Sequence, residues 1–304
     1  MNVTIAGPGS LQAAGSSFDG IDVASTNTLI FGGGEVTARG FWGLGASGFA
    51  APTQWRDPAN VIIAGGSLIA QSESRTIDTT GGAQVHFFNG ALRATSGNSQ
   101  GVGANDRQTG SPWFVNHTRS FRWQTGMDST TPVMQFPPNQ LVIPDGSGFS
   151  TTTPRFFAVT SQTMPVYRLF NAQQSAHFWT GSVVEYENLD RLPGWSGEWI
   201  AWWAPNSGLP VNRLFDSQNN AHVWSGNATE IADLVSRGWT NEGTTFFSAP
   251  LSGFQGRQAA PVHRLENPRP AGTQRHLLSM APAEISELVG RGWIDEGPAF
   301  FALQ

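Results

Sequence analysis

The second half of the chain contains three copies of one pattern, and this repeat constrains the fold more than any other feature. The copies open at Pro165, Pro210 and Pro261 with Pro-Val-x-Arg-Leu. A histidine follows each arginine after nine, nine and twelve residues, and a glutamate follows each histidine eight residues later. A Gly-Trp pair and an aromatic pair then recur in every copy. So many matches at similar offsets indicate three copies of one structural unit.

Local signals predict the same shape for each copy. The Val-x-Arg-Leu run predicts a strand, and the polar turn after it leads into a second strand. A short helix then begins at Ser182, Asn227 or Pro282 and ends before a glycine suited to positive φ. The Trp and the aromatic pair are expected on two further strands. One unit cannot bury its aromatic face alone, so we predict that three units close around an axis. The predicted β-trefoil-like domain covers 165–304, with repeats 165–209, 210–260 and 261–304.

The composite pattern V-x-R-L-F-N, H-F-W-T, E, G-W, E-G and F-F resembles a bacterial and phage repeat family catalogued as a domain of unknown function. The resemblance covers residues 165–304. It implies a β-trefoil-like module of the kind appended to secreted hydrolases, surface proteins and virion proteins. It implies no particular activity.

Residues that recur in all three copies are expected to serve the fold. The repeated glutamates are predicted to cap the helices, the arginines to bind loop carbonyls or glutamates, and the tryptophans to lie in the shared core. These sets are Glu185, Glu230 and Glu284; Arg168, Arg213 and Arg264; and Trp195, Trp239 and Trp293.

Positions that differ between the copies are candidates for binding. Trp179 and Trp224 occupy one slot, two residues after a histidine, and Leu278 occupies it in the third copy. The slot is either core packing or a platform on which a sugar ring stacks, with neighbouring polar groups binding the hydroxyls. The candidate glycan-binding residues are Asn171, His177, Trp179, Asp216, His222 and Trp224.

The sequence of the first half, 1–150, predicts a β-rich domain for assembly and attachment. Gly65-Gly66 between Val61 and Ala70, Gly81-Gly82 between Thr76 and Phe88, and Asn89-Gly90 predict hairpin turns. A meander of this kind is typical of a β-sandwich, jelly roll or prism, so the predicted class is all-β. A Pro-, Ser- and Thr-rich segment predicts a linker at 151–164.

Composition excludes several function classes. The net charge of −5 provides no field for nucleic acid, and the 17 basic residues are all arginine, so no lysine is present for Schiff-base or kinase chemistry. The chain has no cysteine. The Gly-x-Gly-x-x-Gly run at 43–48 lacks the helix that a nucleotide site needs. No metal site, cofactor or catalytic residue is predicted. Neither a signal peptide nor a transmembrane segment is expected.

These features favour a non-enzymatic virion appendage, such as a phage tail or head fibre. Its N-terminal half is expected to attach to a baseplate or capsid protein, and its C-terminal half to bind a host-surface polysaccharide. A homotrimer is expected from this class of architecture. The alternatives are a secreted or tail-associated polysaccharide hydrolase with a trefoil accessory module, in the extracellular space or on a cell surface, and a structural virion protein that binds no sugar.

Overall fold

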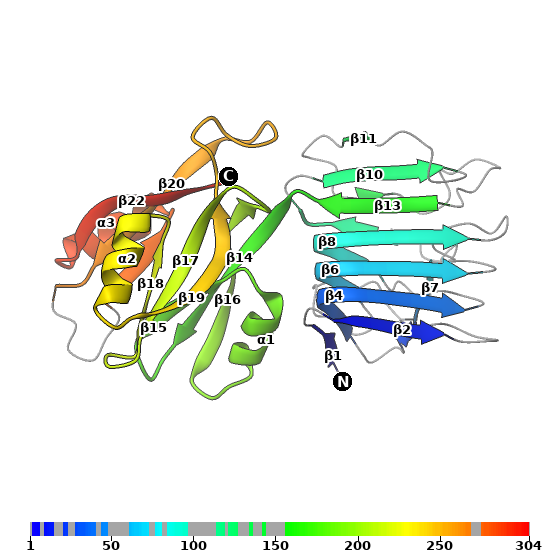
Figure 1. Ribbon diagram of the computed structural model, residues 1–304, viewed down its shortest axis with the longest axis horizontal. Coiled ribbons are helices and arrows are strands. Elements are labelled where there is room, and N and C mark those ends of the chain that lie inside the picture. The colour runs from blue at the N-terminus through cyan, green and yellow to red at the C-terminus, as the bar shows by residue number, and fades with distance from the viewer. Residues whose placement is uncertain are drawn as a thin grey trace. The chain divides into compact units, whose positions relative to one another are not determined.

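The computed structural model consists of two compact units, Met1–Gln162 and Thr163–Gln304. Each unit is built mainly from β-strands, which confirms the predicted all-β class (Figure 1). The structure describes residues 2–6, 9–14, 21–23, 28–40, 44–47, 61–72, 77–80, 84–96, 114–118, 121–126, 134–135, 142–143, 156–268 and 275–303.

The N-terminal unit is a stack of parallel strands. Strands β4 (Thr28–Gly40), β6 (Val61–Ser72) and β8 (Val85–Ser96) pair side by side in parallel (Figure 1). Before each of these strands the chain passes through a second parallel sheet, made of β3 (Ile21–Val23), β5 (Leu44–Ser47) and β7 (Ile77–Thr80). Because the chain alternates between the two sheets, it winds as the coils of a β-solenoid do.

Shorter strands extend this stack on both sides. Strands β1 (Asn2–Ile5) and β2 (Ser10–Ala14) both pair in parallel with β4, and β9 (Phe114–Asn116) pairs in parallel with β8. Beyond β8 the pairing becomes antiparallel, through β13 (Phe156–Ser161), β10 (Phe121–Gly126) and β11 (Met134–Gln135). Strand β12 (Val142–Ile143) pairs with β9.

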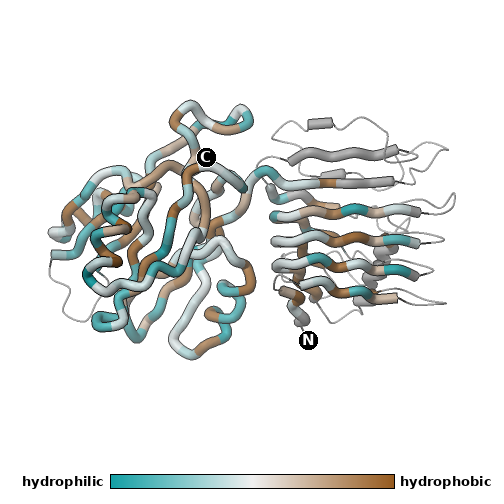
Figure 2. Tube along the Cα trace, in the orientation of Figure 1, coloured by the Kyte–Doolittle hydropathy of each residue, from teal (hydrophilic) through white to brown (hydrophobic). Residues whose placement is uncertain are grey.

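The core of the stack consists of ladders of apolar side chains at equal register. Phe31 pairs with Ile63, which pairs with Phe87, and all three side chains are buried. The other ladders are Leu29, Val61, Val85 and Phe114; Val36, Leu68 and Leu92; and Ala38, Ala70 and Ala94. Figure 2 shows hydrophobic segments recurring on successive strands of this unit. Each coil therefore buries its apolar side chains against the next coil.

The predicted hairpins at Gly65-Gly66 and Asn89-Gly90 are wrong, and so is the antiparallel sandwich, jelly roll or prism built from them. Both dipeptides lie inside continuous strands that pair in parallel. Gly66 and Gly90 have positive φ at a register shift, where the strand bends. A Cβ on Gly66 would lie 2.5 Å from the carbonyl oxygen of Gly34. These glycines are therefore required by close stacking of coils. The Gly81-Gly82 turn lies outside the described residues.

The predicted linker at 151–164 contains a strand of the first unit. Strand β13 pairs with β8 and β10, and the division between the units falls after Gln162. The Thr- and Pro-rich sequence before Phe156 suggested a linker, but the Phe-Phe-Ala-Val run after it favours a strand.

The C-terminal unit contains three copies of a strand–strand–helix–strand repeat. The first comprises β14 (Thr163–Asn171), β15 (Ala176–Thr180), α1 (Val183–Asp190) and β16 (Trp195–Pro205). The second comprises β17 (Leu209–Asp216), β18 (Ala221–Ser225), α2 (Ala228–Ser236) and β19 (Thr240–Ser248). The third comprises β20 (Ala259–Glu266), β21 (His276–Ser279), α3 (Pro282–Gly290) and β22 (Ile294–Leu303).

The repeats differ from the prediction in strand number. One long strand carries both the Trp and the aromatic pair, so each described repeat has three strands where four were predicted. The first strand of each repeat lies between the other two, and a single bridge from Trp203 to Leu303 joins the first and third repeats into one sheet. The four-stranded units on which the trefoil-like prediction rested are therefore absent from the described part of this unit.

The three repeats nevertheless close into a ring. The side chains of Trp202, Phe246 and Phe300 come from equivalent positions, and every pair of them is in contact, with ring centroids 5.3–5.9 Å apart. All three are nearly fully buried. Mutual contact of three equivalent side chains requires the repeats to face a common centre, as the sequence predicted.

The helix signals in the sequence are confirmed. Ser182 accepts a hydrogen bond from the backbone N–H of Glu185, Asn227 caps α2 in the same way, and Pro282 opens α3. Gly194, Gly238 and Gly292 all have positive φ after the helices. Among the described residues, no helix is long and apolar enough to cross a membrane.

Candidate binding pocket

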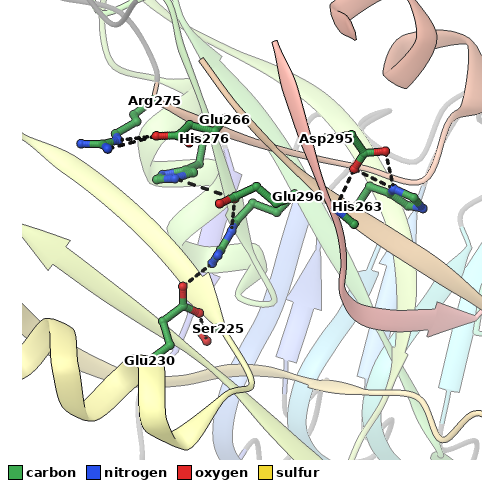
Figure 3. A network of polar contacts seen from close by, with 10 residues as sticks. Ser225, Glu230, His263, Glu266, Arg275, His276, Asp295 and Glu296 are labelled. Carbon is green, nitrogen blue, oxygen red and sulfur yellow. Dashed lines mark hydrogen bonds and ion pairs between the residues drawn. The ribbon is translucent and has the colours of Figure 1, made fainter. Parts of the chain in front are cut away.

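A cyclic set of ion pairs joins the repeats of the C-terminal unit. In the second repeat, Arg213 Nε lies 2.6 Å from Glu242 of β19, and its Nη1 lies 2.9 Å from Glu185 of the preceding helix. Arg264 binds Glu296 and Glu230 in the same way, at 2.6 and 2.8 Å. Figure 3 shows both carboxylates, Glu296 of the third repeat and Glu230 of the second.

Arg168 completes the cycle, because it binds Glu198 of its own repeat and Glu284 of the third repeat. Each arginine thus binds one carboxylate of its own repeat and one from the helix of the repeat before it. The predicted arginine–glutamate contacts are confirmed.

The repeated helix glutamates act mainly between repeats. In Glu185 and Glu230, only the backbone N–H group takes part in helix capping, by donating to the N-cap side chain. The carboxylates of Glu230 and Glu284 instead accept hydrogen bonds from Ser225 and Ser279 and ion-pair with the next arginine around the ring. The predicted capping role is therefore only part of what these residues do.

A pocket of about 650 Å³ lies where the three repeats meet. His177, His222 and His276 occupy equivalent positions on β15, β18 and β21, and all three line it. Their Nε2 atoms lie 3.5, 3.5 and 3.9 Å from the glutamates that bind the repeated arginines. Most of the remaining wall comes from the first and second repeats.

Two of the repeated tryptophans line this pocket. Trp195 and Trp239 are half-buried and form part of its wall together with Phe178. Trp293, at the same position in the third repeat, is also half-buried but lies outside the lining. The prediction that these tryptophans lie in the core is wrong, because each is only half-buried; each directly follows a positive-φ glycine, at or just before the start of a strand.

The Trp179 and Trp224 position, a candidate for stacking on a sugar ring, belongs to the core. Trp179 is 0% exposed and Trp224 is 3% exposed, and their rings contact each other at 5.3 Å. Leu278, at the same position of the third repeat, is also buried. A side chain with no accessible face cannot stack on a ligand, so Trp179 and Trp224 are removed from the candidate site.

The structure brings three of the six predicted binding residues together. His177, His222 and Asp216 line the pocket. Asn171 is buried, and its side chain accepts hydrogen bonds from the backbone of Gln173 and Gln174, which forms an Asx turn. Asp216 forms the equivalent turn with Gln218 and also binds the Asn219 side chain.

The charges around the pocket are largely compensated. Burial opposes the charge of Arg213, but the hydrogen bonds and charges of Glu185 and Glu242 outweigh it, so the pKa of this guanidinium is raised. Burial lowers the pKa of His222, against the attraction of Glu242. Burial, and then the charge of Arg264, lowers the pKa of His276. Both imidazoles are therefore neutral at pH 7 and present one donor and one acceptor each.

A second histidine cluster lies in the N-terminal unit. His86 Nδ1 and His117 Nε2 are 2.9 Å apart, and the ring of Phe88 stacks on His117 with centroids 4.1 Å apart. Burial, and then repulsion from His86, lowers the pKa of His117 to about 3. In the described ranges of either unit, no three His, Asp or Glu residues are grouped as ligands of a metal ion.

Neither the comparison with curated proteins nor the comparison with solved structures finds a match to this chain. A family profile does match, over residues 140–248 and again, in an overlapping alignment, over 165–303. Together the two alignments cover more than half of the chain and all three repeats. The chain therefore belongs to the family described as Domain of unknown function (DUF5648).

Proposed function

We propose that the C-terminal unit binds a saccharide in the pocket between its repeats, without catalysing a reaction on it. The observation that carries this proposal is the pairing of two half-buried indoles, Trp195 and Trp239, with polar side chains in one pocket. Aromatic faces desolvate the C–H face of a sugar ring, while polar groups beside them bind its hydroxyls.

The polar groups of the pocket suit this ligand class. His222 and His276 are neutral and can each donate and accept, as a sugar hydroxyl does. Asn219 and Asn220 add amide groups to the lining. The volume of about 650 Å³ lies within the range of small-ligand pockets, about 300–1,000 Å³. The pocket therefore accommodates a short saccharide or the end of a longer chain.

The wider proposal is that the chain is an appendage of a virion, such as a phage tail or head fibre. The stacked coils of the N-terminal unit support it, because continuous parallel pairing between coils makes a rigid unit suited to assembly and attachment. A homotrimer attached to a baseplate or capsid protein would bind several saccharides at once. Multivalency of this kind converts a weak single-site affinity, with a Kd of about 1 mM, into firm attachment to a polysaccharide surface.

Calorimetric titration of the full chain with a library of oligosaccharides tests the binding proposal. Trp195→Ala and Trp239→Ala are each expected to weaken binding at least about tenfold, the value of one lost aromatic contact. Trp293→Ala is the matched control, since this residue has the same local setting but lies outside the pocket lining. Equal losses in all three variants, or no binding by the wild type, would contradict the proposal.

The same samples separate binding from hydrolysis. Incubation of the full chain with each bound oligosaccharide is expected to leave its length unchanged. Shortened products would favour the alternative of a polysaccharide hydrolase. Detection of the chain in purified virions by mass spectrometry tests the virion proposal separately, and its absence there would contradict that part alone.

A further inference from the structure

We propose that the pocket selects uncharged saccharide units and rejects those that carry a carboxylate, sulfate or phosphate group. This inference rests on the proposed function and names the ligand class within it. It follows from how the charged groups in the lining are already paired.

The arginine in the pocket wall already has two carboxylate partners in the protein itself. Arg213 Nε binds Glu242 and its Nη1 binds Glu185, while the guanidinium carbon lies 4.7 Å from the centroid of the Phe178 ring. An anionic sugar binds firmly when an arginine offers it a free pair of donors. Glu185 and Glu242 compensate the positive charge of Arg213, and the Phe178 ring covers one face of its guanidinium, so this side chain is held as part of the wall.

The other arginine of the described lining is also paired. Arg275 Nη2 lies 3.0 Å from Glu266, and its side chain is 60% exposed, so water screens its charge (Figure 3). Neither arginine of the lining is therefore placed to compensate a negative charge on a ligand deep in the pocket.

Among the described residues of the lining, the carboxylates outnumber these cations. Glu185, Glu242 and Asp216 all contribute to the wall. The hydrogen bond from the Asn219 side chain is the main cause that lowers the pKa of Asp216, so this carboxylate is ionised at neutral pH. The lowered pKa values of His222 and His276 remove two further sources of positive charge.

The size of the discrimination follows from Coulomb's law. A ligand charge about 7 Å from one uncompensated carboxylate, at an effective dielectric constant of about 40, is repelled by roughly 1 kcal/mol, or about fivefold in affinity. Salt screens this repulsion over a Debye length of about 8 Å at physiological ionic strength. Selectivity for neutral sugars is thus expected to be largest at low salt.

The repeat supplies a conservative variant for the test. Asn171 stands at the position equivalent to Asp216 and accepts the same backbone hydrogen bonds with a neutral side chain. Asp216→Asn is therefore expected to keep the turn and remove one negative charge from the pocket wall. Asp233→Asn is the matched control, because it removes a charge from the exposed face of α2, outside the lining.

The experiment titrates the full chain, at 20 mM and at 300 mM salt, with matched pairs of sugars. Galactose is compared with galacturonic acid, and N-acetyllactosamine with its sialylated form. We expect the neutral member of a bound pair to bind at least about fivefold more tightly at the lower salt concentration, and the difference to shrink at the higher. Asp216→Asn should narrow the preference for the neutral sugar about threefold, and Asp233→Asn should leave this preference as in the wild type.

The outcomes separate the inference from the function on which it rests. Equal or tighter binding of the acidic member overturns the neutral selectivity and leaves the saccharide pocket standing. An unchanged preference for the neutral sugar in Asp216→Asn also overturns the electrostatic explanation. Absence of binding to every sugar in the library, neutral and acidic, contradicts the proposed function itself.

Discussion

The two units both repeat a structural element, but they join the copies in different ways. The N-terminal unit stacks coils, and each coil needs only an apolar side chain of suitable size above and below it, as in the Phe31, Ile63 and Phe87 ladder. The C-terminal unit closes three repeats into a ring, and each repeat must present an arginine and a helix glutamate to its neighbours. Specific ion pairs preserve residue identity between copies, whereas stacking preserves mainly side-chain size and polarity, with glycine kept where the coils approach closely.

The largest expected effect is in the core of the ring. Trp179→Ala should reduce the free energy of unfolding of the C-terminal unit by about 3–5 kcal/mol, because it removes a fully buried indole. Trp195→Ala should cost less than about 1.5 kcal/mol, since this indole is only half-buried. Native-state hydrogen exchange on peptides from Thr163–Gln304 measures both values. A smaller loss for Trp179→Ala than for Trp195→Ala would contradict the assignment of core and pocket wall.

Glycine variants compare the stacked coils of the N-terminal unit with the closed ring of the C-terminal unit. Gly66 and Gly238 both have positive φ, at 69° and 96°. A Cβ on Gly66 would meet backbone atoms of Gly33 and Gly34, while one on Gly238 would meet nothing within 4 Å. Gly66→Ala should therefore destabilise the stack by about 3 kcal/mol or more, and Gly238→Ala should cost only the backbone strain, about 1–2 kcal/mol.

Hydrogen exchange of the peptides that span 61–96 and 228–248 reports these two changes separately. Equal losses in the two units would show that close approach of the coils is not what requires glycine at position 66.

The ion-pair cycle should contribute somewhat less. Arg264→Gln leaves Glu230 and Glu296 without their cation, and a loss of about 2 kcal/mol is expected from these partly buried pairs. Arg237→Gln breaks an exposed pair on α2 and should cost under about 0.5 kcal/mol. Urea denaturation monitored by exchange in the C-terminal unit compares the two. If Arg264→Gln reduced the free energy of unfolding no more than Arg237→Gln does, the ion-pair cycle would not be one of the forces that close the ring.

A further expected effect is a pH dependence confined to the N-terminal unit, similar in size at pH 5 to the loss from the ion-pair cycle. The pKa of His117 is lowered to about 3 in the folded protein and is near 6.5 in the unfolded chain, so the unfolded state binds more protons below pH 6.5. Stability is therefore lost as the pH falls from about 6.5 towards 3, by about 2 kcal/mol at pH 5.

In His117→Gln this contribution should be absent. The exchange of 84–96 should then depend less on pH between 7 and 5 than it does in the wild type. The same pH slope in both proteins would contradict the assignment to His117.

The sequence predicted the C-terminal unit far better than the N-terminal unit, for the reason that separates their construction. Matches at Arg168, Arg213 and Arg264 revealed the repeat because the ring requires that residue type. The coils of the stack repeat only short matches, such as the positive-φ glycines Gly34, Gly66 and Gly90, and Gly65-Gly66 has the same signature in a stacked bulge as in a hairpin.

For the binding site, the position of an aromatic residue within the repeat, and not its type, decides whether it lies in the core or in the pocket wall. Trp179 and Trp195 both stand at positions where tryptophan recurs between repeats. Only the structure shows that Trp179 lies in the core and that Trp195 lines the pocket.

The most direct test of the account is a crystal structure of the full chain with a bound neutral oligosaccharide. We predict a sugar ring against the indole of Trp195 or Trp239, with hydroxyls hydrogen-bonded to His177, His222 or Asn219 and no carboxyl group poised on either side of the glycosidic bond. A saccharide bound elsewhere on the molecule, or held between two carboxyl groups at the bond to be cleaved, would contradict it.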